Sequence, residues 1–213
     1  MGEKRSFWHF LTLPAAEPAT PQEYFARLPV IDTPRLILRK MRMSDAPDVY
    51  RYAKDPEVAR HVLWEAHQSV WETRAYIRYL LWQYRSGLPG SWAIELKETG
   101  RVVGTIGYMS YNADNATVEV GYSLAREQWG KGLMTEALTA VIAETFRALD
   151  MHRIEAMHFT DNPASGRVME KCGMTHEGHL RERVCCKGTF RDVEMWGMLR
   201  KDWEKHRRKM GPA

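Results

Sequence analysis

The sequence has few cysteines and no long hydrophobic run, and both absences narrow its class. Its 213 residues include three cysteines, and Cys185 and Cys186 are adjacent, which is not the pattern of a disulfide framework. The longest apolar runs fall short of the roughly 18 residues that a membrane span requires, so we expect no membrane partner. An N-terminal apolar patch is interrupted by Trp8 and His9 and is too short for a signal peptide. We therefore expect a reducing, cytoplasmic location.

Common signatures of metal sites and nucleotide loops are also missing. There is no CxxC pair and no HExxH motif. The two histidines of HEGH (176–179) lie in a predicted strand, where residues three apart point to opposite faces, so we predict no metal site. A GxxxxGK[ST] loop and the third glycine of a dinucleotide fingerprint are absent, which argues against two common phosphate-binding motifs.

What is present fits one globular domain. Hydrophobic residues make up 44% and charged residues 27% of the chain, which is ordinary for a folded protein of this length. Residues 1–29 are rich in proline and lack periodicity, so we interpret them as an extension that either packs on the domain or extends away from it. We expect the domain at residues 30–200 and a basic tail at 201–213. A net charge of +4 leaves a nucleic-acid arm as an alternative to a solvated tail.

Hydrophobic spacing predicts an α+β fold with a mostly antiparallel sheet. Alternating apolar residues indicate strands, and apolar residues three and four apart indicate helices. The predicted order is strand 33–41, helices 44–56 and 69–87, strands 91–96, 101–109 and 117–124, helix 133–149, strand 153–159, helix 162–173, and closing strands 174–184 and 190–200. This order amounts to about six to seven strands flanked by about four helices.

The segment REQWGKGLMTE (126–136) stands where a predicted strand gives way to a helix. A helix N-terminus presents unpaired N–H groups and partial positive charge, which together attract anions. Because Gly130 and Gly132 carry no side chains, a phosphate can approach the amides of residues 128–133, and Lys131 adds a cation. A plain turn, in which the glycines only relieve strain, explains the same spacing.

Three segments carry a resemblance to a known family: VEVGYSLAREQWGKGLMTEAL, FTDNPASGRVMEKCGMTHEGHLRER and KGTFRDVEMWGM. They closely resemble the GNAT superfamily of acyl-CoA-dependent N-acetyltransferases, and in particular its RimJ/RimL branch, which includes ribosomal-protein N-terminal acetyltransferases. The opening TPRLILRKMRMSDAPDVYRYAKDPEV resembles that branch too, so the resemblance spans about residues 30 to 200. It implies a GNAT-like fold with acetyl-CoA as cosubstrate.

The resemblance also implies which residues bind acetyl-CoA. The family's [QR]xxGx[GA] segment, which holds the pyrophosphate through backbone amides, falls on residues 127–132, with Glu127 where the family has Gln or Arg. Backbone groups from Tyr122 to Leu124 are expected at the thioester end, and Asn162 either caps its helix, contacts the cofactor, or does both. The implied cofactor-binding residues are Tyr122, Leu124, Gln128, Trp129, Gly130, Lys131, Gly132, Leu133, Asn162 and Ser165.

Amine acetylation needs a base for the amine, donors for the oxyanion and a proton for the departing sulfur. Glu119, on the polar face of its strand, is the candidate catalytic base and would relay a proton through water, or it is an ordinary solvated glutamate. Ser165 matches the position that the branch uses near the thiolate, as a catalytic proton donor or as a structural serine. The tyrosine acid usual in the family's last helix is absent here. We expect Cys172 to be a buried thiol and the transfer to be direct.

The acceptor is less defined by the sequence. The resemblance implies a primary amine, first of all the N-terminal α-amine of a protein such as a ribosomal protein, with association with the ribosome and a homodimer as further partners. Glu177, Arg181 and Asp192 match the family pattern, and either line the acceptor mouth or hold the closing hairpin together. Two alternatives stay open: an acetyltransferase for a small amine or antibiotic, and a non-catalytic acyl-CoA-sensing or partner-binding domain.

Overall fold

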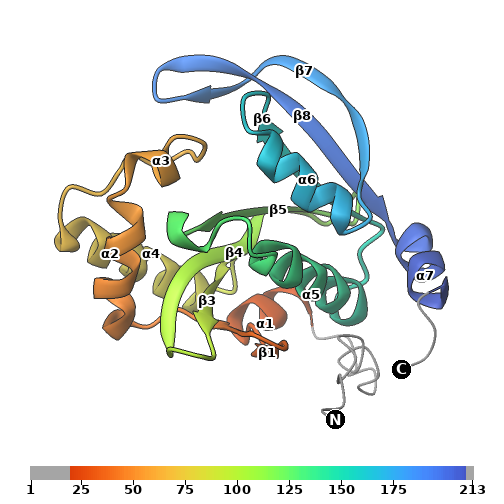
Figure 1. The fold of residues 1–213 in the computed structure, drawn as a ribbon. Helices are drawn as coiled ribbons and strands as arrows, with labels where there is room; N and C mark the ends of the chain where they lie inside the picture. The colour runs from red at the N-terminus through yellow and green to blue at the C-terminus, as the bar shows by residue number, and fades with distance from the viewer. Residues whose placement is uncertain (1–19, 210–213) are drawn as a thin grey trace, which may run out of the picture.

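The computed structural model describes residues 20–209, which form one sheet with helices on both faces (Figure 1). The sheet has eight strands in the order β1-β2-β3-β4-β5-β6-β8-β7, and every neighbouring pair is antiparallel except β5 and β6. The strands are β1 (Ile31–Asp32), β2 (Leu36–Lys40), β3 (Ser91–Leu96), β4 (Arg101–Asn112), β5 (Thr117–Leu124), β6 (Arg153–Phe159), β7 (Thr175–Cys186) and β8 (Thr189–Leu199). The helices are α1 (Pro21–Ala26), α2 (Ala46–Ala53), α3 (Pro56–Ala59), α4 (Val70–Arg85), α5 (Leu133–Ala148), α6 (Pro163–Lys171) and α7 (Arg200–Lys209), with 3-10 turns η2 (Met43–Asp45) and η3 (Arg126–Gln128).

The predicted α+β fold with a mostly antiparallel sheet is confirmed. Helices α2 and α4 lie on one face of the sheet, and α5 and α6 lie on the other (Figure 1). The predicted order of elements is found, and β1, α1, α3 and α7 add to it. The first three of these are too short to show a period in the sequence, because a helical or strand pattern needs more residues to repeat.

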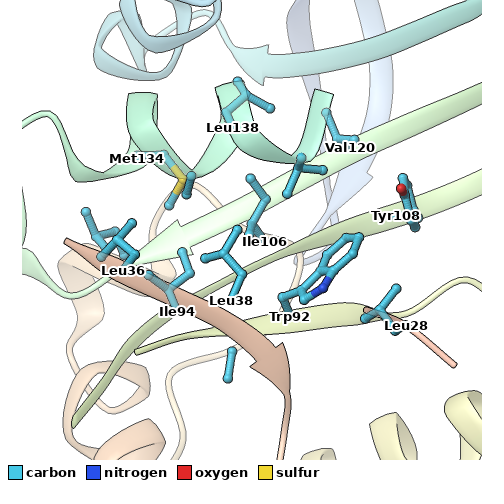
Figure 2. Packing of buried hydrophobic residues seen from close by; sticks show 14 of the residues in the cluster. Leu28, Leu36, Leu38, Trp92, Ile94, Ile106, Tyr108, Val120, Met134 and Leu138 are labelled. Carbon is cyan, nitrogen blue, oxygen red and sulfur yellow. The ribbon is translucent and has the colours of Figure 1, made fainter. Parts of the chain in front are cut away.

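The core lies between the sheet and α5. Ile106 and Val120 point from neighbouring strands toward Leu138 of α5 (Figure 2), and all three side chains are buried. Trp92 is fully buried in β3, and its indole N–H donates to the Pro29 carbonyl at 2.7 Å. Burial of an aliphatic side chain such as Ile106, Val120 or Leu138 stabilises the fold by about 1.5–3 kcal/mol relative to leaving it exposed. The strand that carries the candidate site, β5, is therefore anchored by its inward-facing residues.

Part of the expected N-terminal extension joins this core. Tyr24 and Phe25 of α1 are buried, and both rings contact Tyr108 of β4. Residues 1–19 lie outside the described part of the chain. At the other end, the start of the expected basic tail is helical, because it lies in α7. Trp203 of α7 packs against Phe146 with ring centroids 5.3 Å apart. Residues 210–213 are also outside the described part.

The hairpin of β7 and β8 reaches across the molecule to α3 (Figure 1). At its tip, the Lys187 ammonium donates to the Ala59 carbonyl at 2.8 Å. The tip of the hairpin therefore contacts α3 and the segment that follows it. Within residues 20–209, no helix combines the length and apolar character that crossing a membrane would need.

Candidate active site

The glycine stretch forms an open backbone loop ahead of α5. Gly130 and Gly132 have positive φ angles of 73° and 75°, in the left-handed region that favours glycine. Gly132 is the N-cap of α5, and no side chain caps this helix. Within residues 20–209, the N–H groups of residues 130–135 have no hydrogen-bond acceptor. The helix start thus presents a row of unpaired donors to an anion.

The first two amides of the suggested 128–133 range are already bonded. Gln128 N–H donates to the Ala125 carbonyl at 2.9 Å, and Trp129 N–H donates to the Arg126 carbonyl at 3.1 Å, both within η3. The Trp129 indole N–H donates to the carbonyl of Leu124 at 2.8 Å, so this side chain fixes the loop to the end of β5. The sequence predicted that the amides of residues 128–133 would be available, whereas the unpaired donors in the described residues are those of residues 130–135.

The strands β5 and β6 pair over only part of their length. Their register runs from Thr117 opposite Arg153 to Glu119 opposite Glu155, and no pair follows. From Val120 to Leu124, β5 therefore has β4 on one side and no strand on the other. Backbone groups along such an open edge can bind an extended ligand as a further strand would bind. Tyr122 and Leu124, both suggested as cofactor residues, lie on this open half.

Tyr122 connects β5 to α6 across this opening. Its hydroxyl lies 2.8 Å from the Ser165 hydroxyl and donates to the Ser165 carbonyl at 3.1 Å. Burial raises the pKa of Tyr122 well above its usual range, although the hydrogen bond to Ser165 opposes this shift. Tyr122 of β5 thus places a phenol hydroxyl beside α6, a helix that contains no tyrosine. The strand pattern indicates only the face of Tyr122, which it shares with Val118 and Val120 on the α5 side; the contact with Ser165 depends on tertiary packing.

Asn162 precedes α6, but its side chain makes no capping hydrogen bond, so the cap predicted from its position is not formed. Among the described residues, the side-chain amide of Asn162 has no hydrogen-bond partner, so this side chain is available to a ligand. The helix lies close to β6, because a Cβ on Gly166 would stand 2.6 Å from the His158 ring. Gly166 therefore allows the close approach that places Ser165 beside the opening.

Glu119 occupies the last paired position of β5, at the apex of the opening. Its pKa is raised, first by burial and then by the neighbouring Glu155 carboxylate, while Arg183 opposes the shift. Within residues 20–209, the Glu119 carboxylate forms neither an ion pair nor a hydrogen bond, whereas Glu155 bonds Arg153 at 2.7 Å. Glu119 is therefore a partly buried carboxylate with no fixed partner and with an increased proton affinity.

The hairpin residues suggested for the acceptor mouth are engaged in local contacts. Glu177 forms an ion pair with Arg153. Asp192 accepts a hydrogen bond from the Glu182 N–H at 2.7 Å, where Glu182 has a positive φ of 49°. Arg181 lies on the same irregular stretch of β7, and its positive charge contributes to lowering the pKa of Asp192. For Glu177 and Asp192, these contacts favour the structural of the two readings that the sequence left open.

The expectation that His176 and His179 face opposite sides is wrong. A bulge between His176 and Gly178 inserts one extra residue into β7, which brings both imidazoles to the same side. Their ring nitrogens lie 2.6 Å and 2.9 Å from the two carboxylate oxygens of Glu194. Among the residues that the structure describes, no group of three or more His, Cys, Asp or Glu side chains is arranged to hold a metal ion.

Cys172 is buried at the end of α6, as expected for a structural thiol. Burial raises the pKa of Cys172 to about 11, so the thiolate form is scarce at neutral pH. A nucleophilic cysteine requires the opposite shift. The observed environment therefore agrees with direct transfer.

A small hollow lies on the other face of β5 from Tyr122. Thr105 of β4 and Ser123 of β5 form its floor, with their hydroxyls 3.1 Å apart. Its remaining walls come from α2, α4 and the segment between α3 and α4. The lining residues are Val49, Tyr52, Ala53, Trp64, His67, Tyr76, Thr105 and Ser123. An amine that enters from this side approaches β5 opposite the face that carries α6.

Comparison with known proteins decides the family. A model described as an acetyltransferase (GNAT) domain matches residues 35–175. The chain belongs to this GNAT acetyltransferase family. It is 33% identical over 171 residues to the uncharacterized N-acetyltransferase p20 of Bacillus licheniformis, which covers 80% of this chain and 96% of p20.

Two further matches concern ribosomal proteins. The ribosomal protein uS5-alanine N-acetyltransferase of Escherichia coli (strain K12) is 36% identical over 84 residues, or 39% of this chain and 43% of that enzyme. The solved structure of RimL, a ribosomal L7/L12 alpha-N-protein acetyltransferase in complex with coenzyme A, has a TM-score of 0.72 at 22% identity and covers 80% of this chain and 98% of RimL. The latter likeness establishes the GNAT fold.

As a GNAT member, the protein is an acyl-CoA-dependent N-acetyltransferase with acetyl-CoA as cosubstrate, which sets aside the non-catalytic alternative. The residues present fit this cosubstrate. The donors of residues 130–135 suit a diphosphate, and a Cβ on Gly130 would meet no atom within 4 Å, so a ligand can approach the backbone there. The open edge of β5 suits an extended arm that carries the acetyl group.

The loop generates the first prediction. The substitution Gly130→Ala should weaken coenzyme A binding on the order of 10-fold, because a left-handed non-glycine residue costs about 1–2 kcal/mol and relief of this strain turns the loop amides away from the ligand. Isothermal titration calorimetry with coenzyme A measures the effect. Gly100→Ala is the matched control, since Gly100 also has a positive φ (66°) and open space around it, but lies in the turn between β3 and β4. Equal affinity losses in the two variants would contradict the assignment.

Proposed function

We propose that the protein transfers the acetyl group of acetyl-CoA to the N-terminal α-amine of a protein, such as a ribosomal protein. The position of Glu119 carries this proposal. A single carboxylate with a raised pKa stands at the apex of the β5–β6 opening, on the same strand as Tyr122 to Leu124, where the resemblance to the family places the thioester end. Such a group can accept one proton from an amine that is already partly deprotonated.

The energy of deprotonation favours an α-amine over a lysine side chain. An α-amine with a pKa of about 8 costs about 1 kcal/mol to deprotonate at pH 7, whereas a lysine with a pKa of about 10.4 costs about 4–5 kcal/mol. Glu119 has one nearby acid, Glu155, and one opposing arginine, Arg183, as its main charged neighbours. A base in this setting suits the less demanding acceptor.

The proposed reaction needs no covalent enzyme intermediate. The free amine attacks the thioester carbonyl, a C–N bond forms, and the amine proton passes to Glu119 through water. The tetrahedral intermediate then collapses with cleavage of the C–S bond, and the departing thiolate takes the hydroxyl proton of Ser165. Ser165 regains a proton from water, and Glu119 releases the amine proton to water, so no net proton is gained or lost. Tyr122, at 2.8 Å from the Ser165 hydroxyl, orients that hydroxyl and can polarise it. Asn162 and the amides of residues 130–135 hold the coenzyme.

Support for a protein acceptor comes from the relatives named above, which include enzymes for ribosomal proteins. Association with the ribosome, a homodimer and a cytoplasmic location belong to the same proposal.

The acceptor is tested by mass spectrometry with acetyl-CoA and three acceptor classes: ribosomal-protein N-terminal peptides, peptides with a blocked N-terminus and a free lysine, and small amines including aminoglycosides. We expect acetylation of free α-amines, with kcat/KM at least about 100-fold above that for lysine, which corresponds to the difference in deprotonation cost. Turnover confined to small amines would replace the protein acceptor by that alternative.

The role of Glu119 is tested by the pH dependence of kcat/KM. Glu119 must be ionised to accept a proton, so activity should rise with pH through its raised pKa. Glu155→Gln removes a like charge and lowers the pKa of Glu119, so this acid limb should move to lower pH. The acceptor amine must also lose a proton before it attacks, and its titration contributes equally to the pH profile of kcat/KM in every variant. Glu98→Gln, in the exposed turn between β3 and β4, is the control, and an acid limb that stays fixed in Glu155→Gln argues against Glu119 as the base.

The Ser165–Tyr122 contact generates a separate prediction. Ser165→Ala should lower kcat by about 100-fold, as expected when a proton donor is lost, with little change in acetyl-CoA affinity. Tyr122→Phe should lower kcat by about 3–10-fold, because it removes the hydrogen bond that orients Ser165. Stopped-flow detection of free coenzyme A gives these rates. Tyr108→Phe breaks a more deeply buried hydrogen bond, to Thr145 at 2.7 Å, and should reduce stability but not kcat. A kcat loss in Tyr108→Phe as large as that in Tyr122→Phe would point to packing instead.

A further inference from the structure

The loop of residues 126–132 ahead of α5 is called the coenzyme loop below. Arg35 contacts it although Arg35 lies 96 positions before Lys131 in the chain. One guanidinium N–H (Nη1) donates to the Lys131 carbonyl at 2.9 Å. A second (Nε) donates to Glu136 Oε2 at 2.6 Å. The guanidinium thus links the loop to the first turn of α5. The family motif in residues 127–132 does not include this arginine.

The Glu136 carboxylate is fully engaged by the segment that precedes β2. It accepts hydrogen bonds from the Arg35 N–H at 2.8 Å and from the Thr33 hydroxyl at 2.7 Å, in addition to the guanidinium. Its side chain is only 7% exposed. An acidic side chain in a first turn normally lies near the helix amides, where it would compete with an anionic ligand. Here both oxygens are turned toward Thr33 and Arg35, and the Arg35 charge offsets that of Glu136.

The contact with the Lys131 carbonyl also orients a loop amide. In a trans peptide unit the C=O and the following N–H point in opposite directions, and the described residues contain no cis peptide. A guanidinium that holds the Lys131 carbonyl on one side therefore directs the Gly132 N–H to the other. Gly132 N–H is one of the unpaired donors at the start of α5.

We propose that Arg35 is a positioning residue for coenzyme binding: it holds the Lys131–Gly132 peptide and the Glu136 carboxylate so that the loop amides face the diphosphate. It acts through the loop rather than by contact with the reacting atoms. The effect requires a planar group that forms both bonds at once, which lysine cannot do.

The test uses Arg35→Ala and Arg35→Lys with three acetyl donors. Acetyl-CoA and its dephospho form both carry the diphosphate, whereas S-acetyl-pantetheine lacks it. Both variants should raise KM for the first two donors about 10-fold, as expected for a lost charged hydrogen bond, with kcat within about twofold and with KM for S-acetyl-pantetheine unchanged. Calorimetry with coenzyme A should show the same loss of affinity.

Arg35→Lys retains a cation beside Glu136, so the test stands even if Arg35→Ala does not fold. Arg101→Ala is the control, because Arg101 forms a comparable half-exposed ion pair with Asp48 at 3.1 Å, away from the loop. Full recovery of affinity in Arg35→Lys would show that charge alone matters and would overturn the proposal. An equal KM increase for S-acetyl-pantetheine, or unchanged KM values in both variants, would overturn it as well.

Discussion

The early end of pairing between β5 and β6 is the constraint on which the site depends. Three residue pairs join these parallel strands, and beyond Glu119 the edge of β5 has no strand partner. An unpaired strand edge can promote aggregation, because its N–H and C=O groups can pair with another chain. It becomes a binding surface when a ligand completes these hydrogen bonds. The opening is held by packing on both borders. Val118 and Val120 anchor β5 in the core, and Gly166 seats α6 against His158 of β6.

This arrangement makes β5 the element that orders the proposed chemistry. Glu119 stands at the apex, Tyr122 contacts Ser165 further along, and Leu124 leads into the coenzyme loop. Leu124 lies five residue steps along the strand from Glu119, about 17 Å at the usual rise per residue. A ligand fixed by its diphosphate at the loop would thereby be directed toward Glu119, the proposed base at the apex. The bond from the Trp129 indole to the Leu124 carbonyl keeps the two ends in register.

The sequence could predict the parts of this site that follow from local pattern. Hydrophobic spacing identified β2 to β8 and helices α2, α4, α5 and α6, and the glycines marked the loop, because both signals involve neighbouring residues. The features that depend on pairing were not accessible. The bulge that turns His176 and His179 to one side, the end of the β5–β6 register and the bond from Tyr122 to Ser165 all arise from tertiary contacts. Asn162 stands in a cap position but forms no cap, since propensity gives a position and not a partner.

Two glutamates near the same cosubstrate illustrate how the surroundings divide their roles. Glu136 is enclosed by donors from Thr33 and Arg35, an arrangement that suits a structural task. Glu119 is partly buried beside Glu155 and, among the described residues, has no ion-pair partner, so its proton affinity increases. Coulomb attraction and hydrogen bonds stabilise the charged form of an acid, whereas burial and a like charge favour uptake of a proton. The difference between the two carboxylates therefore lies in their neighbours, and it separates the acid that holds the loop from the acid suited to accept the amine proton.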